Sequence, residues 1–226
     1  MFEKSKLRNI LNKYRKQQYA LNMLLTTFED NDYDYAIVGG FVRRVLTNEW
    51  NSFSDFDIIV DIPSTWIKHI IKHFGFSFSE NSNGGFSIKD NNNNNNMSID
   101  IWSLQDHSPF ITNYPDLSKS FENIQKASII SIDGGTYMPA KNKLYWDFLR
   151  KSIKQNQIFC LNNPVNYIGK AKIGARLIYL NLTTDFNLSD EAAAFCKTCK
   201  RLRSLNFKVQ KYLKHILDKR GCSSIG

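Results

Sequence analysis

The sequence has few cysteines and no long apolar run. Its 4 cysteines are unevenly placed along 226 residues, so they do not predict the disulfide framework of a small secreted protein. No segment approaches the roughly 20 consecutive apolar residues of a membrane-spanning helix, and the N-terminus has no signal-peptide core. We therefore expect reduced cysteines, no membrane partner and a cytoplasmic location.

Hydrophobic residues make up 42% of the chain, enough for one substantial core or two small ones. The net charge of +9 is concentrated at the two ends of the chain. Between residues 197 and 220, nine basic residues accompany a single acidic one, Asp218, whereas the middle of the chain is slightly acidic. This distribution suits a protein that holds a polyanion with one part and cations with another, and a solvated helix face is the alternative.

The apolar spacing predicts an α+β fold in which a mixed α/β region precedes a helical one. Residues 5–28 have the spacing of one long amphipathic helix. Strand patterns lie at 35–38, 56–62, 97–104, in a hairpin of 76–79 with 86–89, and in a second hairpin of 127–132 with 136–138. Helical patterns lie at 41–46, 64–74, 143–154, 165–182 and 189–217. The expected domains are an N-terminal helix at 1–32, a mixed-sheet head at 33–140, and a helical neck with a basic tail at 141–226.

Two glycines and two aspartates follow one another in an order suited to phosphate chemistry. Gly39 and Gly40 stand where a predicted strand turns into a helix, so the backbone can approach a triphosphate whose charge the helix N-terminus favours. Asp55 and Asp57 lie two residues apart on the next strand, so they project from one face and can hold two divalent cations.

A third carboxylate, Asp100, lies on a later strand, on the face opposite Ile99 and Ile101. If that strand neighbours the Asp55–Asp57 strand, the three carboxylates converge. Such a set suits phosphoryl transfer, because one metal ion can bind the triphosphate and the leaving oxygen while the other lowers the pKa of the attacking hydroxyl. A lone pair of aspartates is often only solvated. The occurrence of a glycine turn, an aspartate pair and a third aspartate in this order is what favours a metal site.

This order resembles the polymerase-beta-like nucleotidyltransferase superfamily, and within it the head of class II tRNA CCA-adding enzymes and bacterial poly(A) polymerases. The segment from Gly39 to Arg43 is similar to the family's Gly-Gly-x-Val-Arg-Asp turn, and Asp55 to Asp57 is similar to its Asp-x-Asp strand. The resemblance implies a nucleotidyltransferase head in which two Mg²⁺ or Mn²⁺ ions serve catalysis. The catalytic and metal-binding residues that it implies are Asp55, Asp57 and Asp100.

A fainter resemblance extends over roughly residues 34–180. Residues 124–130 are similar to the family's Arg-Arg-Asp-Phe-Thr-Ile-Asn stretch, and residues 170–177 to its neck helix. Arg44 replaces the aspartate of the family's turn, and the neck lacks the Glu-Asp-x-x-Arg element that selects the incoming base. The nucleotide-binding residues implied by the resemblance are Gly39, Gly40, Arg43, Lys126, Lys172 and Arg176.

The expected reaction moves a nucleoside monophosphate from a nucleoside triphosphate to a hydroxyl, with the 3′ end of a tRNA-like RNA as the favoured acceptor. The basic tail would hold the RNA backbone through Lys200, Arg203, Lys211 and Lys214. Two alternatives stay open. The acceptor is a protein, a nucleotide or a small molecule, as in toxin and antiphage members of the superfamily, or the chain is a catalytically silent nucleic-acid-binding module, which the departures from the family's motifs favour.

Overall fold

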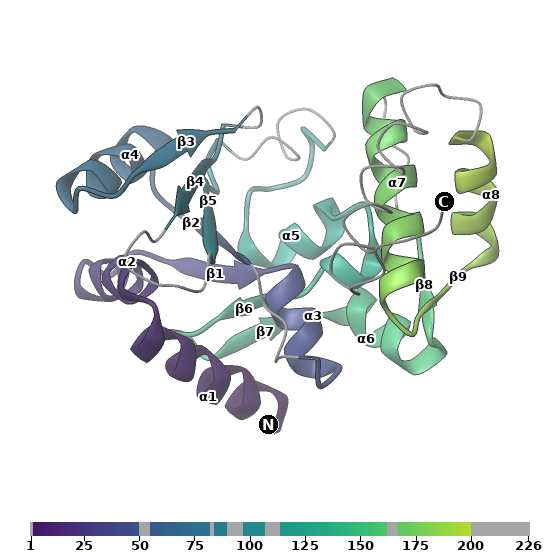
Figure 1. The fold of residues 1–226 in the computed structure, drawn as a ribbon, viewed down its shortest axis with the longest axis horizontal. Coiled ribbons are helices and arrows are strands. Elements are labelled where there is room, and N and C mark those ends of the chain that lie inside the picture. Colours follow the sequence, from purple (N-terminus) through teal and green to yellow (C-terminus); the bar gives the residue numbers. More distant parts are fainter. Residues whose placement is uncertain are drawn as a thin grey trace, which may run out of the picture. The chain divides into compact units, whose positions relative to one another are not determined.

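The computed structural model describes residues 2–49, 55–81, 84–89, 97–106, 114–161 and 167–199. The chain forms two compact units (Figure 1). The first unit contains Met1–Ala127 and Asp133–Asp147, and the second contains Ser128–Ile132 and Phe148–Gly226. The first unit thus includes the N-terminal helices and continues beyond residue 140, the end of the head expected from the sequence.

The first unit is built on a mixed sheet of seven strands in the order β3-β4-β5-β2-β1-β6-β7. The β2 and β5 strands run parallel, and the other neighbouring pairs are antiparallel. The strands are β1 (Tyr35–Val38), β2 (Asp55–Val60), β3 (Phe78–Glu80), β4 (Phe86–Lys89), β5 (Ser98–Ser103), β6 (Thr136–Met138) and β7 (Lys143–Tyr145). The helices are α1 (Phe2–Gln17), α2 (Tyr19–Asp30), α3 (Gly40–Leu46), α4 (Ser64–His73) and α5 (Phe121–Ala127). The predicted α+β class with a mixed sheet is confirmed.

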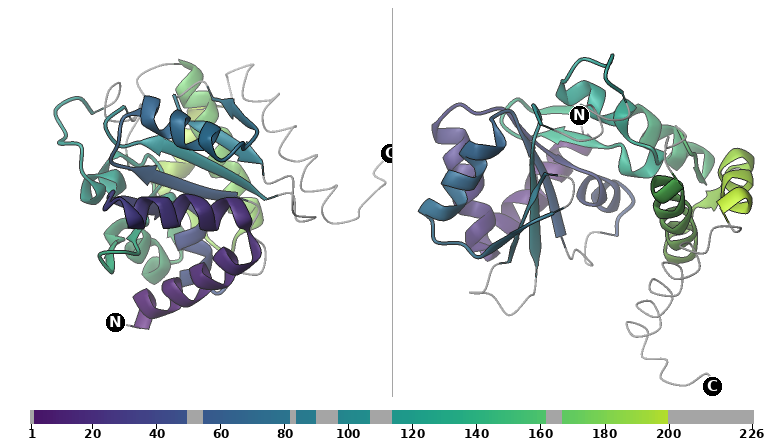
Figure 2. Two further views of the ribbon diagram at one scale, coloured as in Figure 1. Left: turned by 90° about the vertical axis from the view of Figure 1, so that its left-hand side faces the viewer. Right: turned by 90° about the horizontal axis from the view of Figure 1, so that it is seen from above.

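The two faces of the sheet are covered by different helices. On one face the ring of Phe56 packs against Tyr14 of α1 and Phe41 of α3, and Figure 2 shows α1, α2 and α4 on one side of the strands. On the other face, α5 packs Phe121 and Ile124 in a cluster with buried residues of β1, β2 and β6. The second face therefore has an apolar part under α5 and leaves the beginning of β2 outside that cluster.

The long N-terminal helix predicted at 5–28 is wrong, because the chain forms two helices that part at Gln18, whose backbone is extended (φ −121°, ψ 104°). Arg15 shows why the break is needed. Its guanidinium lies 2.8 Å from Glu29 Oε1, although 14 residues in a straight helix span about 21 Å. The turn at Gln18 folds α2 back along α1, so both helices bury their leucines.

The hairpin predicted at 127–138 is also wrong. Residues 127–132 form no strand, because α5 ends at Ala127 and residues Ser131–Asp133 form a 3₁₀ turn. The Asp-Gly-Gly segment is used instead to reach β1, since Gly135 accepts a hydrogen bond from Gly39 N at 3.1 Å. The β6 strand pairs with β1 on one side and with β7 on the other, and β7 forms at residues where the sequence pattern predicts the start of a helix.

The second unit is mainly helical, with α6 (Asp147–Gln155) starting at the boundary, then α7 (Tyr167–Thr183) and α8 (Asp190–Cys199). It also contains a short parallel pair that the sequence did not predict, β8 (Gln157–Ile158) with β9 (Asn187–Leu188). Buried leucines and alanines of α7 and α8 form its core. The helix predicted to reach residue 217 is described as far as Cys199, and the basic tail lies outside the described residues. None of the described helices has the length and apolar character needed to cross a membrane.

Candidate active site

A tight glycine turn joins β1 to α3. Gly39 has φ +65° and ψ −124°, a conformation that side-chain-bearing residues rarely adopt. A Cβ atom at Gly39 would lie 3.1 Å from Asp57 Oδ2 and 4.0 Å from the carbonyl oxygen of Asp133. At Gly40, by contrast, a Cβ atom would meet no described atom within 4 Å. The turn therefore lies against the Asp57 carboxylate on one side and borders open space on the other.

The three predicted catalytic aspartates come from two neighbouring parallel strands. Asp57 of β2 is the Cα partner of Asp100 of β5, and Asp55 stands one row further along β2 beside Ser98. Paired residues of neighbouring strands point to the same face, and strands lie about 4.8 Å apart. Asp55 is exposed, and Asp57 and Asp100 are half-buried. The expected adjacency of the two strands is thus present, and it brings the three residues onto one face.

The charges of these aspartates affect one another. Burial is the main cause that raises the pKa of Asp100, a hydrogen bond donated by the Ser87 hydroxyl acts against it, and the negative charge of Asp55 raises it further. Carboxylate oxygens, such as those on this face, are the donor atoms that hard divalent ions such as Mg²⁺ or Mn²⁺ prefer. With the side chains as they stand, the described residues contain no group of three or more His, Cys, Asp or Glu placed to hold a metal ion.

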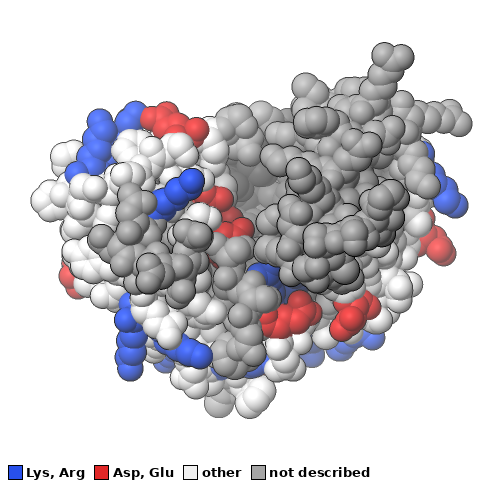
Figure 3. Space-filling model, viewed as in Figure 1, with Lys and Arg blue, Asp and Glu red and all other residues white. Residues whose placement is uncertain are grey.

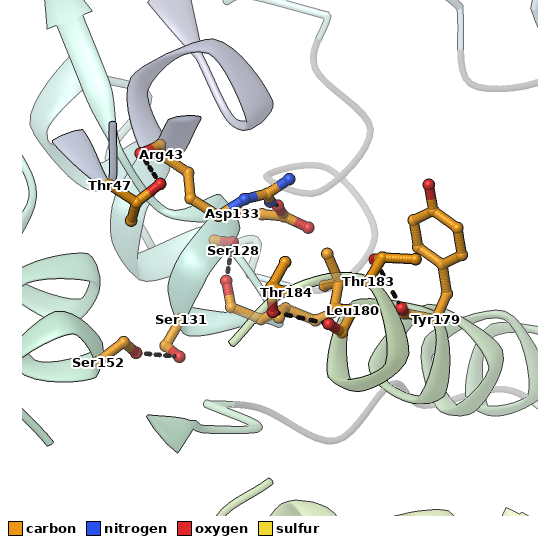
Figure 4. Close-up of polar contacts among 11 residues, drawn as sticks. Arg43, Thr47, Ser128, Ser131, Asp133, Ser152, Tyr179, Leu180, Thr183 and Thr184 are labelled. Atoms are coloured by element: carbon orange, nitrogen blue, oxygen red, sulfur yellow. Dashed lines mark hydrogen bonds and ion pairs between the residues drawn. The ribbon is translucent and has the colours of Figure 1, made fainter. Parts of the chain in front are cut away.

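Arg43 was expected beside the triphosphate, and the structure gives it a partner within the protein. The residue is 3% exposed, and its Nη1 lies 2.5 Å from Asp133 Oδ1 (Figure 4). Together with the hydrogen bond from Gly39 N to Gly135 O, this ion pair fastens the glycine turn and α3 to the segment before β6. This role of Asp133 could not be read from the sequence, because Asp133-Gly134-Gly135 has the composition of a hairpin turn.

The other predicted nucleotide-binding residues are spread over both units. Lys126 is exposed in the last turn of α5 in the first unit. Lys172 and Arg176 lie on α7 in the second unit, where the Arg176 guanidinium is 5.6 Å from the ring centre of Tyr179. The side chain of Lys172 lies outside the described part of the chain, as do the tail residues Lys200, Arg203, Lys211 and Lys214.

The structure adds polar residues of β4 to the aspartate face. Ser87 is the Cα partner of Asp100, and Lys89 is the Cα partner of Ser98, which in turn pairs with Asp55. Sequence reasoning missed both residues. The alternation of Phe86 and Ile88 with Ser87 and Lys89 predicts a polar face on this strand, but the strand that it pairs with could not be derived from the alternation.

The first unit is thus a mixed sheet with a glycine turn after β1 and aspartates on the paired strands β2 and β5. Solved structures with this fold include a CCA-adding enzyme with CTP, which matches with a TM-score of 0.64 and 18% identity over 93% of this chain and 50% of that one. The Thermotoga maritima CCA-adding enzyme complexed with tRNA_CCA matches with a TM-score of 0.64 and 18% identity, over 92% of this chain and 50% of that one.

A tRNA nucleotidyltransferase complexed with a primer tRNA and an incoming ATP analog matches with a TM-score of 0.58 and 17% identity, over 85% of this chain and 55% of that one. The chain therefore spans about half the length of these proteins. No family model matches the sequence, and no curated protein matches it. The resemblance to CCA-adding enzymes, noted from the sequence, is confirmed at the level of the fold.

Proposed function

We propose that the chain is a metal-dependent nucleotidyltransferase that moves a nucleoside monophosphate from a nucleoside triphosphate to the 3′-hydroxyl of an RNA. The observation that carries this proposal is the pairing of Asp57 with Asp100 across β2 and β5, beside the Gly39 turn. A carboxylate pair on one sheet face is costly unless solvent or cations compensate its charge. Placed next to a turn bordered by open space, it suits a site for a metal-bound triphosphate.

Each part of the site has a defined task in this proposal. Asp55, Asp57 and Asp100 would hold two Mg²⁺ or Mn²⁺ ions, which when bound neutralise the triphosphate and lower the pKa of the attacking hydroxyl. The bare backbone at Gly39 and Gly40 lets the phosphates approach closely. The remaining nucleotide contacts that we propose are Lys126, Lys172 and Arg176.

Arg43 has a positioning role in this proposal. Its guanidinium holds Asp133 and so fixes the turn that approaches the triphosphate. An arginine that is always charged suits this task, since its planar group keeps one geometry when it is buried against a carboxylate. In this proposal Arg43 acts through the backbone of the turn, whereas the resemblance implied that it binds the nucleotide.

An RNA acceptor is favoured by the solved neighbours and by the charge of the tail. Two of those neighbours are described as complexes with tRNA. On the surface seen in Figure 3, the basic side chains of the described residues are scattered among acidic ones. We therefore assign the RNA backbone contacts to the tail residues Lys200, Arg203, Lys211 and Lys214.

The test is to incubate the purified chain with each α-labelled nucleoside triphosphate, Mg²⁺ or Mn²⁺, and total RNA. We expect label in RNA, dependent on the metal and lost in Asp57→Ala. Asp116→Asn, which changes an exposed aspartate outside the strands, is the matched control and should remain active. Label in protein or in a small molecule would replace the RNA acceptor with one of those classes. Triphosphate binding without any transfer would identify a catalytically silent module and contradict the proposal.

A further inference from the structure

The β4 strand places a basic residue in the same register row as the first aspartate. Lys89 is the Cα partner of Ser98 on β5, and Ser98 is the Cα partner of Asp55 on β2. Residues paired in this way share one face of the sheet. The row of Lys89, Ser98 and Asp55 therefore runs beside the row of Ser87, Asp100 and Asp57, on the face that carries all three aspartates.

The burial of β4 agrees with this assignment. Phe86 and Ile88 are buried, with 4% and 0% exposure, on the opposite face of the strand. Ser87 is half-buried and donates its hydroxyl hydrogen bond to Asp100. Lys89 is exposed at the end of the strand. Of the two polar side chains of β4, one is thus engaged with a carboxylate of the site and the other extends into solvent beside it.

Several other bases of the first unit are held by acidic residues. Arg43 pairs with Asp133, Lys68 with Glu80, Lys141 with Asp34 and Arg15 with Glu29. For Lys89, the structure shows no ion pair with any of the residues that it describes. Among the described residues, its ammonium therefore has no ion-paired carboxylate.

The distances on the sheet allow an anion bound by Lys89 to be a substrate phosphate at the aspartates. Lys89 on β4 and Asp55 on β2 are separated by two strand spacings of about 4.8 Å each, which places their Cα atoms roughly 10 Å apart. The flexible four-carbon stem of lysine and a bound phosphate group together can span this gap. The site also calls for a cation, because three aspartates and a triphosphate carry more negative charge than two divalent ions neutralise, and lysines commonly bind phosphoryl groups at such sites.

We propose that Lys89 is a substrate-binding residue of the active site, whose ammonium binds a phosphate group at the edge of the aspartate face. The phosphate belongs to the incoming nucleoside triphosphate or to the backbone of the acceptor RNA. This inference rests on the proposed nucleotidyl transfer, and it adds a residue from a strand that carries no aspartate of the site.

The experiment compares the full-length protein with Lys89→Gln, Lys89→Arg and the matched control Lys72→Gln. Lys72 is an exposed lysine of α4, whose buried isoleucines pack toward the sheet from the opposite face. Transfer is measured while ATP or CTP is varied at saturating RNA, and while a tRNA transcript lacking its 3′ CCA is varied at saturating nucleotide. Binding of a Mg²⁺ complex of a non-hydrolysable ATP analogue is measured separately by calorimetry.

We expect Lys89→Gln to lower kcat/KM for one substrate about tenfold or more, as the loss of a charge-assisted contact does. Lys89→Arg, which keeps the charge, should be less affected than Lys89→Gln, and Lys72→Gln should be near the wild type. A raised KM for the nucleotide identifies the triphosphate as the source of the phosphate. A raised KM for RNA, with a salt slope of binding smaller by about one, identifies the acceptor backbone.

Identical kinetics and binding of Lys89→Gln and the wild type in both series would overturn the assignment of Lys89. If the wild type transfers nothing, the proposed reaction fails, and the binding measurements still decide on Lys89. Weaker binding of the ATP analogue or of RNA by Lys89→Gln than by Lys72→Gln would then support the phosphate contact, and equal binding would refute it.

Discussion

The Asp57 carboxylate lies against Gly39, so closely that a Cβ atom at Gly39 would come 3.1 Å from Asp57 Oδ2. The glycine turn and the Asp-x-Asp strand, 16 to 18 residues apart in the sequence, are therefore one structural unit. The turn sets where the carboxylate stands, and the carboxylate limits what the turn can contain.

Gly39→Ala is predicted to impair nucleotidyl transfer beyond its effect on stability. The backbone of Gly39, with φ +65° and ψ −124°, lies in a region that is almost restricted to glycine and costs an alanine roughly 1–3 kcal/mol, and the methyl group would displace Asp57. Gly75→Ala is the control, because Gly75 has φ +69° and no described atom within 4 Å of its Cβ position. Both variants should lose stability in urea unfolding, but only Gly39→Ala should lose activity. Equal activity of the two would show that the close approach to Asp57 is unimportant.

Asp100→Asn is predicted to stabilise the metal-free protein near neutral pH while abolishing transfer. Burial raises the pKa of Asp100, so the folded protein keeps this proton to a higher pH than the unfolded chain does. The free energy of unfolding therefore falls as the pH rises through the interval between the unfolded and the folded pKa. The amide removes this loss and still accepts the hydrogen bond from Ser87.

Thermal unfolding of both proteins without divalent metal, measured across a pH series, checks this prediction. The melting temperature of Asp100→Asn should exceed that of the wild type above the interval, and the two should converge below it. A variant that is less stable than the wild type at neutral pH would show that the carboxylate is held by favourable interactions, contrary to its raised pKa.

Asp133→Ala is predicted to destabilise the first unit by about 3 kcal/mol, because it leaves the guanidinium of Arg43, whose side chain is 4% exposed, without its carboxylate. Asp34→Ala removes a carboxylate from an ion pair whose side chains are 35% and 47% exposed, and should cost less than about 1 kcal/mol. Chemical denaturation of the two variants measures the difference. Similar losses would mean that the Arg43–Asp133 pair contributes no more than a surface contact.

Replacing Lys200, Arg203, Lys211 and Lys214 with glutamine is predicted to weaken RNA binding without changing nucleotide affinity. Each lost phosphate contact lowers the magnitude of the slope of log affinity against log salt by about 0.7–0.9, so losing four contacts should lower it by about 2.8–3.6. A salt series of RNA binding measures this change. An unchanged slope would identify the basic tail as a solvated surface and favour a protein or small-molecule acceptor.

The parts of the site that depend on local interactions could be predicted from the sequence, whereas the parts that depend on pairing between distant segments could not. The alternation within β2 is local, so it placed Asp55 and Asp57 on one face, and the glycine turn is likewise a local signal between a strand pattern and a helix pattern. The pairing of β2 with β5, which brings Asp100 to Asp57, depends on sheet register, and alternation fixes only the face. Lys89 could not be assigned to the site for the same reason, because the alternation within β4 does not show that this strand pairs with β5.

The errors in the predicted fold have a shared cause as well. The apolar pattern of residues 5–28 continues through Gln18, whereas the extended backbone of Gln18 and the contacts of Arg15 with Thr26 and Glu29 across the bend show the break. The Asp133-Gly134-Gly135 segment has hairpin composition, yet the Gly135 carbonyl accepts a hydrogen bond from Gly39 N and the Asp133 carboxylate pairs with Arg43. In both places tertiary contacts override a local signal, as they commonly do.

We propose that Asp55, Asp57 and Asp100 hold the metal ions of nucleotidyl transfer, and counting bound Mn²⁺ tests this assignment. Electron paramagnetic resonance can titrate Mn²⁺ into the wild type, Asp57→Ala and the exposed control Asp116→Asn, each with a non-hydrolysable ATP analogue. The account predicts two ions per chain in the wild type and in the control, and a loss of at least one ion in Asp57→Ala. Equal stoichiometry and affinity in all three proteins would contradict it.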